Sequence, residues 1–305
     1  MRLGLLSAIC DKASFDEVLD IAASIGYESL ELCAWPRSEG ATRRYAGVSH
    51  IDVDNLTDET VADIQRKLAD RNITLTALGY YPNTITDDLD QRAFYVAHLK
   101  KMIVGAAKLG VPVVSTFIGR VQHLTIDENL DIFASVWPEI IECAEQHGIK
   151  VAIEHCPMLF DQDQWPGGQN LMTTPAIWRR AFEIIPSPNF GLTYDPSHFI
   201  WQMIDYIKPL YEFADRIFHV HYKDIKVFAD KLNDHGSMAY PLQYMAPKLP
   251  GLGDVDWGKF VSALKDIGYS AGAVVEVEDK AFEATDDDVL GALRQSYRYM
   301  RNFVV

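Results

Sequence analysis

The stretch Gly148-Ile149-Lys150-Val151-Ala152-Ile153-Glu154-His155 contains the pattern on which the fold prediction rests. A glycine closes a helical segment, a short apolar run with β-branched residues follows, and the run ends in an acid and a histidine. Glycine at the end of a helix adopts the left-handed conformation that stops the helix and turns the chain. Short apolar runs of this kind are typical of strands in buried parallel sheets. The stretch therefore predicts a helix, a turn, and a strand with polar groups at its carboxyl end.

The same unit recurs along the 305 residues. Strands are expected over residues 2–6, 29–33, 74–79, 111–117, 150–155, 190–195, 217–222 and 272–278. Helical periodicity predicts helices over residues 14–24, 58–70, 90–108, 127–147, 174–184, 203–213, 256–267 and 286–301. Eight strands alternating with eight helices, and no GxGxxG turn after the first strand, favour a closed barrel over an open doubly wound sheet. We predict an α/β fold, a single (β/α)₈ TIM-barrel domain over residues 1–305.

The joints between the elements support this alternation. Glycines stand between a helix and the next strand at four joints, Gly26, Gly110, Gly148 and Gly268. Ser14 and Asp127 are candidate helix caps, because each precedes an acidic first turn. Two connections are long, residues 156–173 after the fifth strand and 223–255 after the seventh. Their aromatic, proline and glycine residues predict ordered lids over the end of the barrel where active sites of such barrels lie.

Composition limits the classes of function. The formal charge is −15, and an acidic surface repels phosphate backbones and anionic lipid, so we expect no nucleic-acid partner and no membrane surface. The four cysteines form no CxxC pair, which favours reduced thiols in a cytoplasmic protein. No apolar run is long enough to span a membrane. Barrels of this type often pair, so a homo-oligomer remains open.

Polar residues at the carboxyl ends of four consecutive strands carry the chemistry. The fifth strand ends in Glu154-His155, the sixth in Asp195 with His198 close behind, the seventh in His221, and the eighth in Glu276. Burying such groups without partners costs several kcal/mol each, and four of them converging on a cation removes that cost. Three carboxylates and one imidazole suit Mn²⁺, with Co²⁺ or Mg²⁺ as alternatives, better than a structural zinc. Solvated strand ends or a salt-bridge network are the competing interpretation.

These motifs give the chain a family resemblance. The sequence resembles the xylose-isomerase-like barrel proteins, the sugar phosphate isomerase/epimerase superfamily, through motifs that run from the fifth strand to the last: Ile153-Glu154-His155, Tyr194-Asp195-Pro196-Ser197-His198, His219-Val220-His221-Tyr222-Lys223-Asp224, Pro250-Gly251-Leu252-Gly253-Asp254-Val255-Asp256-Trp257 and Val275-Glu276-Val277-Glu278. Members of that superfamily include ketose epimerases, inosose dehydratases and isomerases, hydroxypyruvate isomerases and a DNA-repair endonuclease. The resemblance therefore implies a metal-dependent barrel enzyme without specifying its substrate.

Carried over residue by residue, the resemblance implies that Glu154, Asp195, His221 and Glu276 hold one divalent metal ion. It also implies that Glu154 and Glu276 are acid–base groups on opposite sides of the substrate, and that His198 touches a substrate oxygen or metal-bound water. The implied activity is isomerisation or epimerisation of a monosaccharide, keto-sugar or related polyol, through a metal-stabilised enediolate. The alternative is a lyase or dehydratase acting on an inosose or a 3-keto-glycoside with the same metal.

The sequence departs from the ketohexose 3-epimerases at two places. A further glutamate is expected a few residues after Glu154, but the chain reads Cys156-Pro157-Met158-Leu159-Phe160. An arginine is expected soon after the strand-seven histidine, but Ile225-Lys226-Val227 follows Asp224. These differences argue against a free ketohexose. The sequence also argues against the endonuclease branch, because the extra metal-binding histidines of that branch are missing from the ends of the third and fourth strands.

The remaining candidates are a proton carrier and substrate contacts. His155 follows Glu154 directly, so strand alternation points its side chain away from Glu154, as a supporting residue or, for a lyase, as a catalytic one. The candidate substrate contacts follow strands or lie in the long loops, with ordinary packing or a surface position as the competing reading for each: Tyr80, Phe117, Arg120, Trp165, His198, His219 and Lys223.

Overall fold

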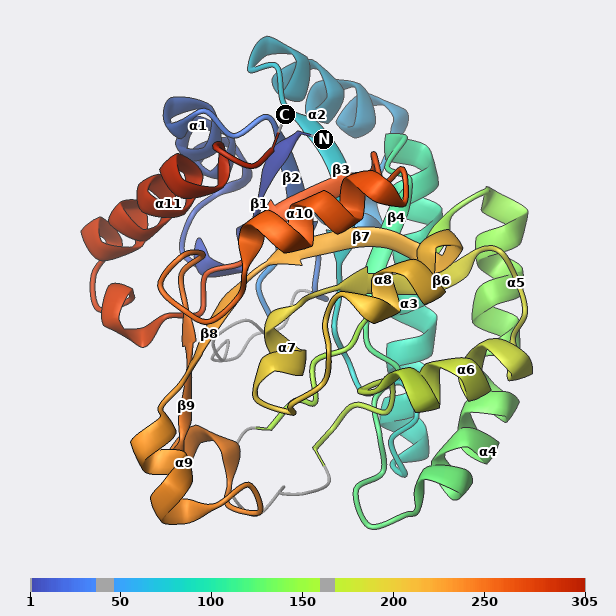
Figure 1. Ribbon diagram of the computed structural model, residues 1–305. Coiled ribbons are helices and arrows are strands. Elements are labelled where there is room, and N and C mark those ends of the chain that lie inside the picture. Colours follow the sequence, from blue (N-terminus) through green and yellow to red (C-terminus); the bar gives the residue numbers. More distant parts are fainter. Residues whose placement is uncertain (1, 37–46, 160–167, 305) are drawn as a thin grey trace.

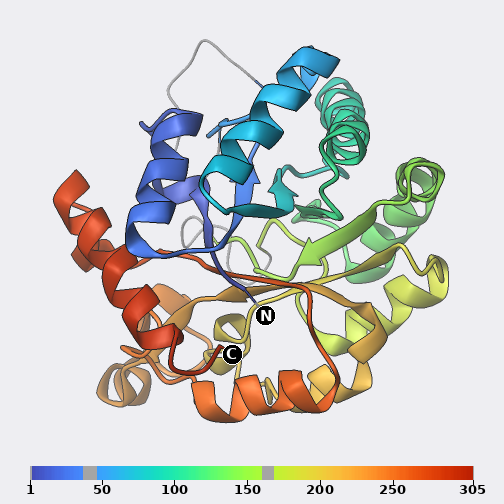
Figure 2. The same cartoon turned by 90° about the horizontal axis from the view of Figure 1, so that it is seen from above.

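The computed structural model describes residues 2–36, 47–159 and 168–304 and confirms the closed barrel. Its parallel strands follow the spatial order β1, β10, β7, β6, β5, β4, β3, β2 around the barrel (Figures 1 and 2). The strands are β1 Leu3–Leu6, β2 Ser29–Cys33, β3 Thr74–Gly79, β4 Val113–Thr116, β5 Lys150–Glu154, β6 Phe190–Tyr194, β7 Ile217–Tyr222 and β10 Gly272–Val275. Each predicted strand is present, and the largest shift at an end is three residues, at the last strand.

Helices surround the strands in chain order, as Figure 2 shows from above. They are α1 Phe15–Ile25, α2 Asp58–Asp70, α3 Leu89–Leu109, α4 Ile126–Val136, α5 Pro138–His147, α6 Pro175–Ile184, α8 Lys208–Glu212, α10 Trp257–Asp266 and α11 Asp286–Met300. Two further helices, α7 Ser197–Ile200 and α9 Ala229–His235, lie in the connections after β6 and β7. Short 3₁₀ turns occur at η1 Ser7–Ile9, η2 Val53–Asn55, η4 Ala214–Arg216, η5 Pro241–Gln243 and η6 Lys280–Phe282.

The predicted joints explain where the helices begin and end. Ser14 caps α1 in a reciprocal capping box with Glu17, which satisfies two backbone N–H groups at the helix start. The four joint glycines all have positive φ, from 68° at Gly148 to 109° at Gly26. A residue with a Cβ would be strained in that conformation. Apolar helix faces and the strands share one buried core, and each fully buried large side chain contributes roughly 1.5–3 kcal/mol.

Three predictions about helices were wrong in detail. The helix expected over residues 127–147 is two helices, because Pro138 lacks an N–H and its ring clashes with the carbonyl four residues earlier. Its cap is Thr125, whose side chain accepts from the Glu128 N–H, and Asp127 lies inside the first turn. The helix expected over 203–213 is limited to α8, which begins at Lys208.

The connection after β7 is ordered, as predicted. It begins with an antiparallel hairpin, β8 Asp224–Val227 paired with β9 Met245–Lys248, which extends from the barrel together with α9 (Figure 1). The buried Asp224 carboxylate accepts from the backbone N–H groups of Gly251 and Val255 and from Trp257 Nε1. The motif around residues 250–257 is therefore a loop fastened to the start of β8. Part of the other predicted lid lies outside the described residues.

No helix in the described parts of the chain is long and apolar enough to cross a membrane. The cysteines Cys10, Cys33, Cys143 and Cys156 are free thiols.

Candidate metal and active site

The ends of β5 and β6 bring three predicted site residues together. Glu154 is the last residue of β5, and Asp195 follows β6 directly. Asp195 Oδ1 accepts from the Ser197 N–H at 2.8 Å, which starts the short helix α7 and places His198 one turn after Asp195. His198 Nε2 then lies 2.9 Å from Glu154 Oε1 and 3.2 Å from Asp195 Oδ2. A single imidazole thus connects two of the predicted metal ligands.

Lys223 connects the centre of the site to the end of β10. Its side chain is 3% exposed, so the surface interpretation of this lysine was wrong. Nζ lies 3.2 Å from Asp195 Oδ2, 3.0 Å from Glu276 Oε2 and 3.1 Å from Glu278 Oε2. An ammonium removed from water is stable only beside compensating charge. Lys223 is therefore part of the site's charge balance, at the position where three carboxyl groups converge.

His221 connects Glu276 to a residue that sequence reasoning missed. His221 Nδ1 lies 3.1 Å from Glu276 Oε2, while His221 Nε2 donates to Glu31 Oε2 at 2.8 Å. His219, two residues earlier on the same face of β7, places Nε2 2.9 Å from the same Glu31 oxygen. Glu31 also accepts from the Tyr81 hydroxyl. This fully buried glutamate on β2 holds both histidines.

The sequence did contain a signal for Glu31. The residue interrupts an otherwise apolar strand, Ser29-Leu30-Glu31-Leu32-Cys33, at a point where a carboxylate needs a partner. The partners come from β7, 190 residues away along the chain, so only the closed barrel reveals them.

The residues present fit a divalent cation. Glu154 Oε1, Asp195 Oδ2 and His198 Nε2 lie close together and are buried, yet none makes a hydrogen bond of good geometry to the described residues. Such atoms carry a desolvation cost that a cation offsets. Three carboxylates with the Nδ1 atom of His221 form a hard, oxygen-rich donor set. The quartet is not one tight cluster, however. His221 groups with Glu31 and His219, whereas Glu154 groups with Cys156 and His198.

The charges of the site fix its protonation. Burial opposes ionisation of Glu276, but the Lys223 ammonium and the His221 imidazole outweigh it and hold the pKa of Glu276 below its usual value. The pKa of Asp195 is lowered in the same way, with Lys223 and then His198 overcoming burial. Burial also opposes ionisation of Glu31, yet His221 and His219 lower its pKa. These carboxyl groups are therefore held in the ionised form that a cation requires.

His198 has the opposite shift. Burial disfavours its charged form, but the neighbouring Cys156 thiol and the carboxylates of Asp195 and Glu154 raise the pKa of His198 well above its usual value. The imidazole is therefore held in its protonated form between the two carboxylates.

His155 supports this cluster from behind, with its ring 5.6 Å from the His198 ring. It is fully buried, its ring stacks on Phe199 at 4.6 Å, and it packs edge-on against Trp178 and Tyr194. Its Nε2 accepts from the backbone N–H of Asp195 at 3.1 Å. Burial, followed by the nearby His198 charge, lowers the pKa of His155 well below its usual value, so the ring is neutral. The contact supports a role in holding Asp195 in place.

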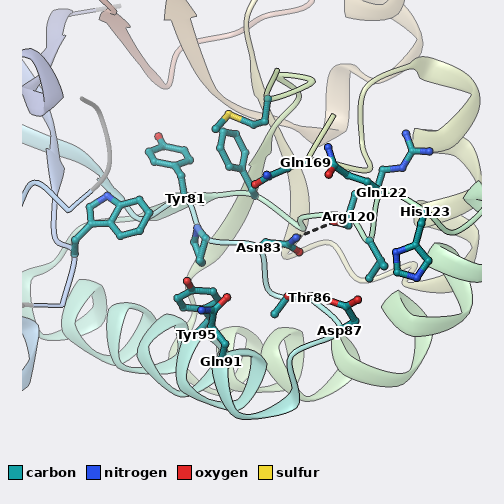
Figure 3. A pocket seen from close by; sticks show the side chains of 15 residues that line it. Tyr81, Asn83, Thr86, Asp87, Gln91, Tyr95, Arg120, Gln122, His123 and Gln169 are labelled. Carbon is teal, nitrogen blue, oxygen red and sulfur yellow. Dashed lines mark hydrogen bonds between the residues drawn. The ribbon is translucent and has the colours of Figure 1, made fainter. Parts of the chain in front are cut away.

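The predicted substrate contacts occupy different environments. Tyr80 is fully buried, and its ring packs against Trp35 and His98 in the core. The next residue, Tyr81, turns instead toward the site. Phe117 and Arg120 line a cavity beside β3 and β4, which Figure 3 shows from close by. Trp165 lies outside the described residues.

The comparison with protein families agrees with this fold. The family model described as xylose isomerase-like TIM barrel matches residues 19–303, so the chain belongs to that family.

Relatives and solved structures point to a range of activities within it. The chain is 25% identical over 280 residues to an inosose isomerase of Bacillus velezensis, covering 87% of this chain and 88% of that protein. It is 31% identical over 113 residues to an inosose dehydratase of Geobacillus thermodenitrificans, covering 36% and 38%. The IolI protein, solved with a zinc atom, superposes with a TM-score of 0.73 at 19% identity over 100% of both chains. A D-psicose 3-epimerase of Clostridium cellulolyticum gives 0.73 at 16% identity, covering 100% and 99%.

The two sequence relatives named here thus differ in reaction type, one being an isomerase and the other a dehydratase, and the similarities leave the reaction of this chain open.

Proposed function

We propose that the protein is a divalent-metal-dependent isomerase or epimerase of a monosaccharide, keto-sugar or related polyol. One observation carries the proposal. Glu154 and Glu276 stand at opposite ends of a continuous set of contacts, which runs from Glu154 through His198, Asp195 and Lys223 to Glu276. A substrate placed over Asp195 would therefore have a carboxyl group on each side.

The two carboxyl groups give the site a way to move one proton. Glu276, held as a carboxylate by Lys223 and His221, accepts a proton from a carbon that lies next to a carbonyl group. Glu154, once protonated by His198 Nε2 at 2.9 Å, delivers that proton to the opposite face of the same carbon, while Glu276 keeps the abstracted proton until it exchanges with water. That sequence inverts one stereocentre. If a proton is delivered to the neighbouring carbon of the enediolate instead, the carbonyl group moves by one carbon and an aldose and a ketose are interconverted.

The predicted metal site supports this chemistry. Glu154, Asp195, His221 Nδ1 and Glu276 would hold the ion, with Mn²⁺ expected and Co²⁺ or Mg²⁺ as alternatives. A divalent cation bound there would stabilise negative charge developing on substrate oxygens. The Nε2 atom of His221 is hydrogen-bonded to Glu31 at 2.8 Å, so Nδ1 is the nitrogen directed at the predicted metal site. Sugar-sized substrates, rather than nucleic acid, agree with the charge of −15.

A lyase or dehydratase acting on an inosose or a 3-keto-glycoside is the second candidate, and Lys223 favours it. Elimination of water requires an acid that protonates the leaving hydroxyl group as a base removes a proton nearby. The Lys223 ammonium lies 3.0 Å from Glu276 Oε2, so a positive charge that would stabilise the departing hydroxyl group stands beside the base. The local similarity to an inosose dehydratase agrees with this candidate.

One experiment separates the candidates. The Mn²⁺-loaded protein is incubated in D₂O with monosaccharides, inososes and 3-keto-glycosides, and the products are analysed by NMR and mass spectrometry. Deuterium at a stereocentre, with the number of oxygen atoms unchanged, supports the isomerase or epimerase. Loss of water or of the aglycone supports the lyase. No conversion, together with an unchanged metal content in the Glu154→Gln variant, would reject both.

A further inference from the structure

A second compartment lies beside the predicted metal site. It is a cavity of about 420 Å³ between the ends of β3 and β4 and the start of α3 (Figure 3). That volume falls within the roughly 300–1,000 Å³ of small-molecule sites. None of the four predicted metal ligands lines it. The cavity is therefore distinct from the place where the proton is moved, and the proposed reaction leaves it without a role.

The wall of this cavity has the composition of a site for a neutral, hydroxyl-rich group. Trp35, Tyr81, Tyr95 and Phe117 supply aromatic surface. Side-chain amides of Gln91, Gln122 and Gln169 share the same wall, whereas the Asn83 amide is bonded to the Arg120 carbonyl oxygen. Amides both donate and accept hydrogen bonds, as paired sugar hydroxyls require, and aromatic faces pack against C–H groups.

The charged groups of the wall balance one another. Asp87 supplies one carboxylate and Arg120 one guanidinium, with His123 as a further titratable group. Burial lowers the pKa of Arg120, so its charge already lacks full solvation. A phosphate or carboxylate ligand needs a surplus of positive charge, usually with paired donors. The described lining residues offer no such surplus, which favours a neutral ligand.

Tyr81 connects the cavity to the reaction centre. Its ring forms part of the cavity wall and lies 4.9 Å from the Phe117 ring. Its hydroxyl donates to Glu31 and is 3.0 Å from Ser115 Oγ. Glu31 in turn holds His221, a predicted metal ligand. Tyr81 therefore contacts both the cavity and the glutamate that holds His221, which places the cavity next to the predicted metal site.

We propose that this cavity binds the non-reacting part of a neutral glycoside, a second sugar ring or an equally polar uncharged group, joined to the sugar that reacts between Glu154 and Glu276. The proposal rests on the function proposed above and narrows its substrate class. It makes the protein selective for a two-unit substrate over a free monosaccharide or a sugar phosphate.

Binding calorimetry tests the proposal without turnover. The Mn²⁺-loaded protein is titrated with glucose, glucose 6-phosphate, cellobiose and maltose. At least one of the two disaccharides should bind at least 10-fold more tightly than glucose and at least 10-fold more tightly than glucose 6-phosphate. Tyr95→Ala and Gln122→Ala should remove most of that preference, whereas Leu89→Ala, on the same helix as Tyr95 but exposed and outside the wall, should keep it. Gln122→Trp, which fills the cavity, should weaken disaccharide binding and leave glucose binding unchanged.

Three outcomes overturn the proposal: equal binding of glucose and both disaccharides, tighter binding of the phosphate, or a preference that survives both cavity variants. The result is independent of the proposed reaction. A protein that binds a disaccharide through Tyr95 but converts no sugar keeps the cavity assignment and loses the isomerase. A protein that converts free monosaccharides, and whose cavity variants bind disaccharides as the wild type does, keeps the proposed isomerase and loses the cavity assignment.

Discussion

The ammonium of Lys223 lies 3.0 Å from Glu276 Oε2, inside a barrel that buries the lysine almost completely. The ammonium therefore sits among Asp195, Glu276 and Glu278, where the proposed reaction needs a base. The four predictions that follow concern this site and the loop that Asp224 fastens beside it.

Replacing Lys223 with methionine should destabilise the metal-free protein. The variant leaves three carboxyl groups without their shared counter-charge, and breaking a buried ion pair typically costs about 3–5 kcal/mol. Mn²⁺ should restore part of this loss, so the metal should raise the melting temperature more in the variant than in the wild type. Thermal unfolding with chelator and with Mn²⁺ measures both effects.

Lys226→Met, which removes an exposed pair with Asp254, serves as the control and should cost less than about 1 kcal/mol. Equal stability of the two variants would refute the assigned role of Lys223.

Replacing Glu31 with glutamine should weaken metal binding. Glu31 accepts from His221 Nε2 and thereby directs Nδ1 at the metal site, and loss of such a supporting carboxylate typically costs 10–100-fold in metal affinity. Calorimetric titration with Mn²⁺ gives the affinity directly. Glu28→Gln, an exposed neighbour just before β2, should bind Mn²⁺ as the wild type does. Unchanged affinity in Glu31→Gln would show that the contact does not orient His221.

His155 should contribute to loss of stability in mild acid. Its folded-state pKa is lowered by burial, so the unfolded chain binds a proton that the folded protein excludes. That contribution is fully present above the unfolded pKa of about 6.5 and is lost as the pH falls below it, at up to about 1.4 kcal/mol per pH unit. The free energy of unfolding, measured with urea between pH 5 and 8, should depend less steeply on pH in His155→Gln than in the wild type. The exposed His147→Gln should leave the slope unchanged, and a His155→Gln slope equal to that of the wild type would contradict the neutral assignment.

The motif after β9 should tolerate alanine at one glycine and not at another. A Cβ on Gly253 would lie 2.2 Å from Asp224 Oδ1 and 2.4 Å from the Ile225 carbonyl oxygen. Gly253→Ala must therefore displace the loop that Asp224 fastens, at a cost of about 1–3 kcal/mol. Gly258→Ala, in the first turn of α10 with its nearest neighbour at 3.4 Å, should gain up to about 1 kcal/mol. Chemical denaturation compares the two, and similar effects would mean that the close approach is relieved elsewhere.

The sequence was sufficient for the barrel because each unit carries local information. Residues 148–155 show the turn glycine, the buried strand and its polar end together, and such signals depend on neighbours a few residues away. Pro138 was the local signal that sequence reasoning undervalued, and it splits the expected helix into α4 and α5.

The tertiary structure decided how the polar strand ends combine. Glu31 and His221 meet across 190 residues, and Lys223 turns inward to three carboxyl groups, because closure of the barrel brings the ends of β2, β6, β7 and β10 to one place. Local periodicity cannot encode such contacts, since they depend on which strands become neighbours. Closure of the barrel also gives Tyr80 and Tyr81 different surroundings. Successive side chains at the end of a strand face opposite sides, so Tyr80 lies in the core around the barrel and Tyr81 faces the site.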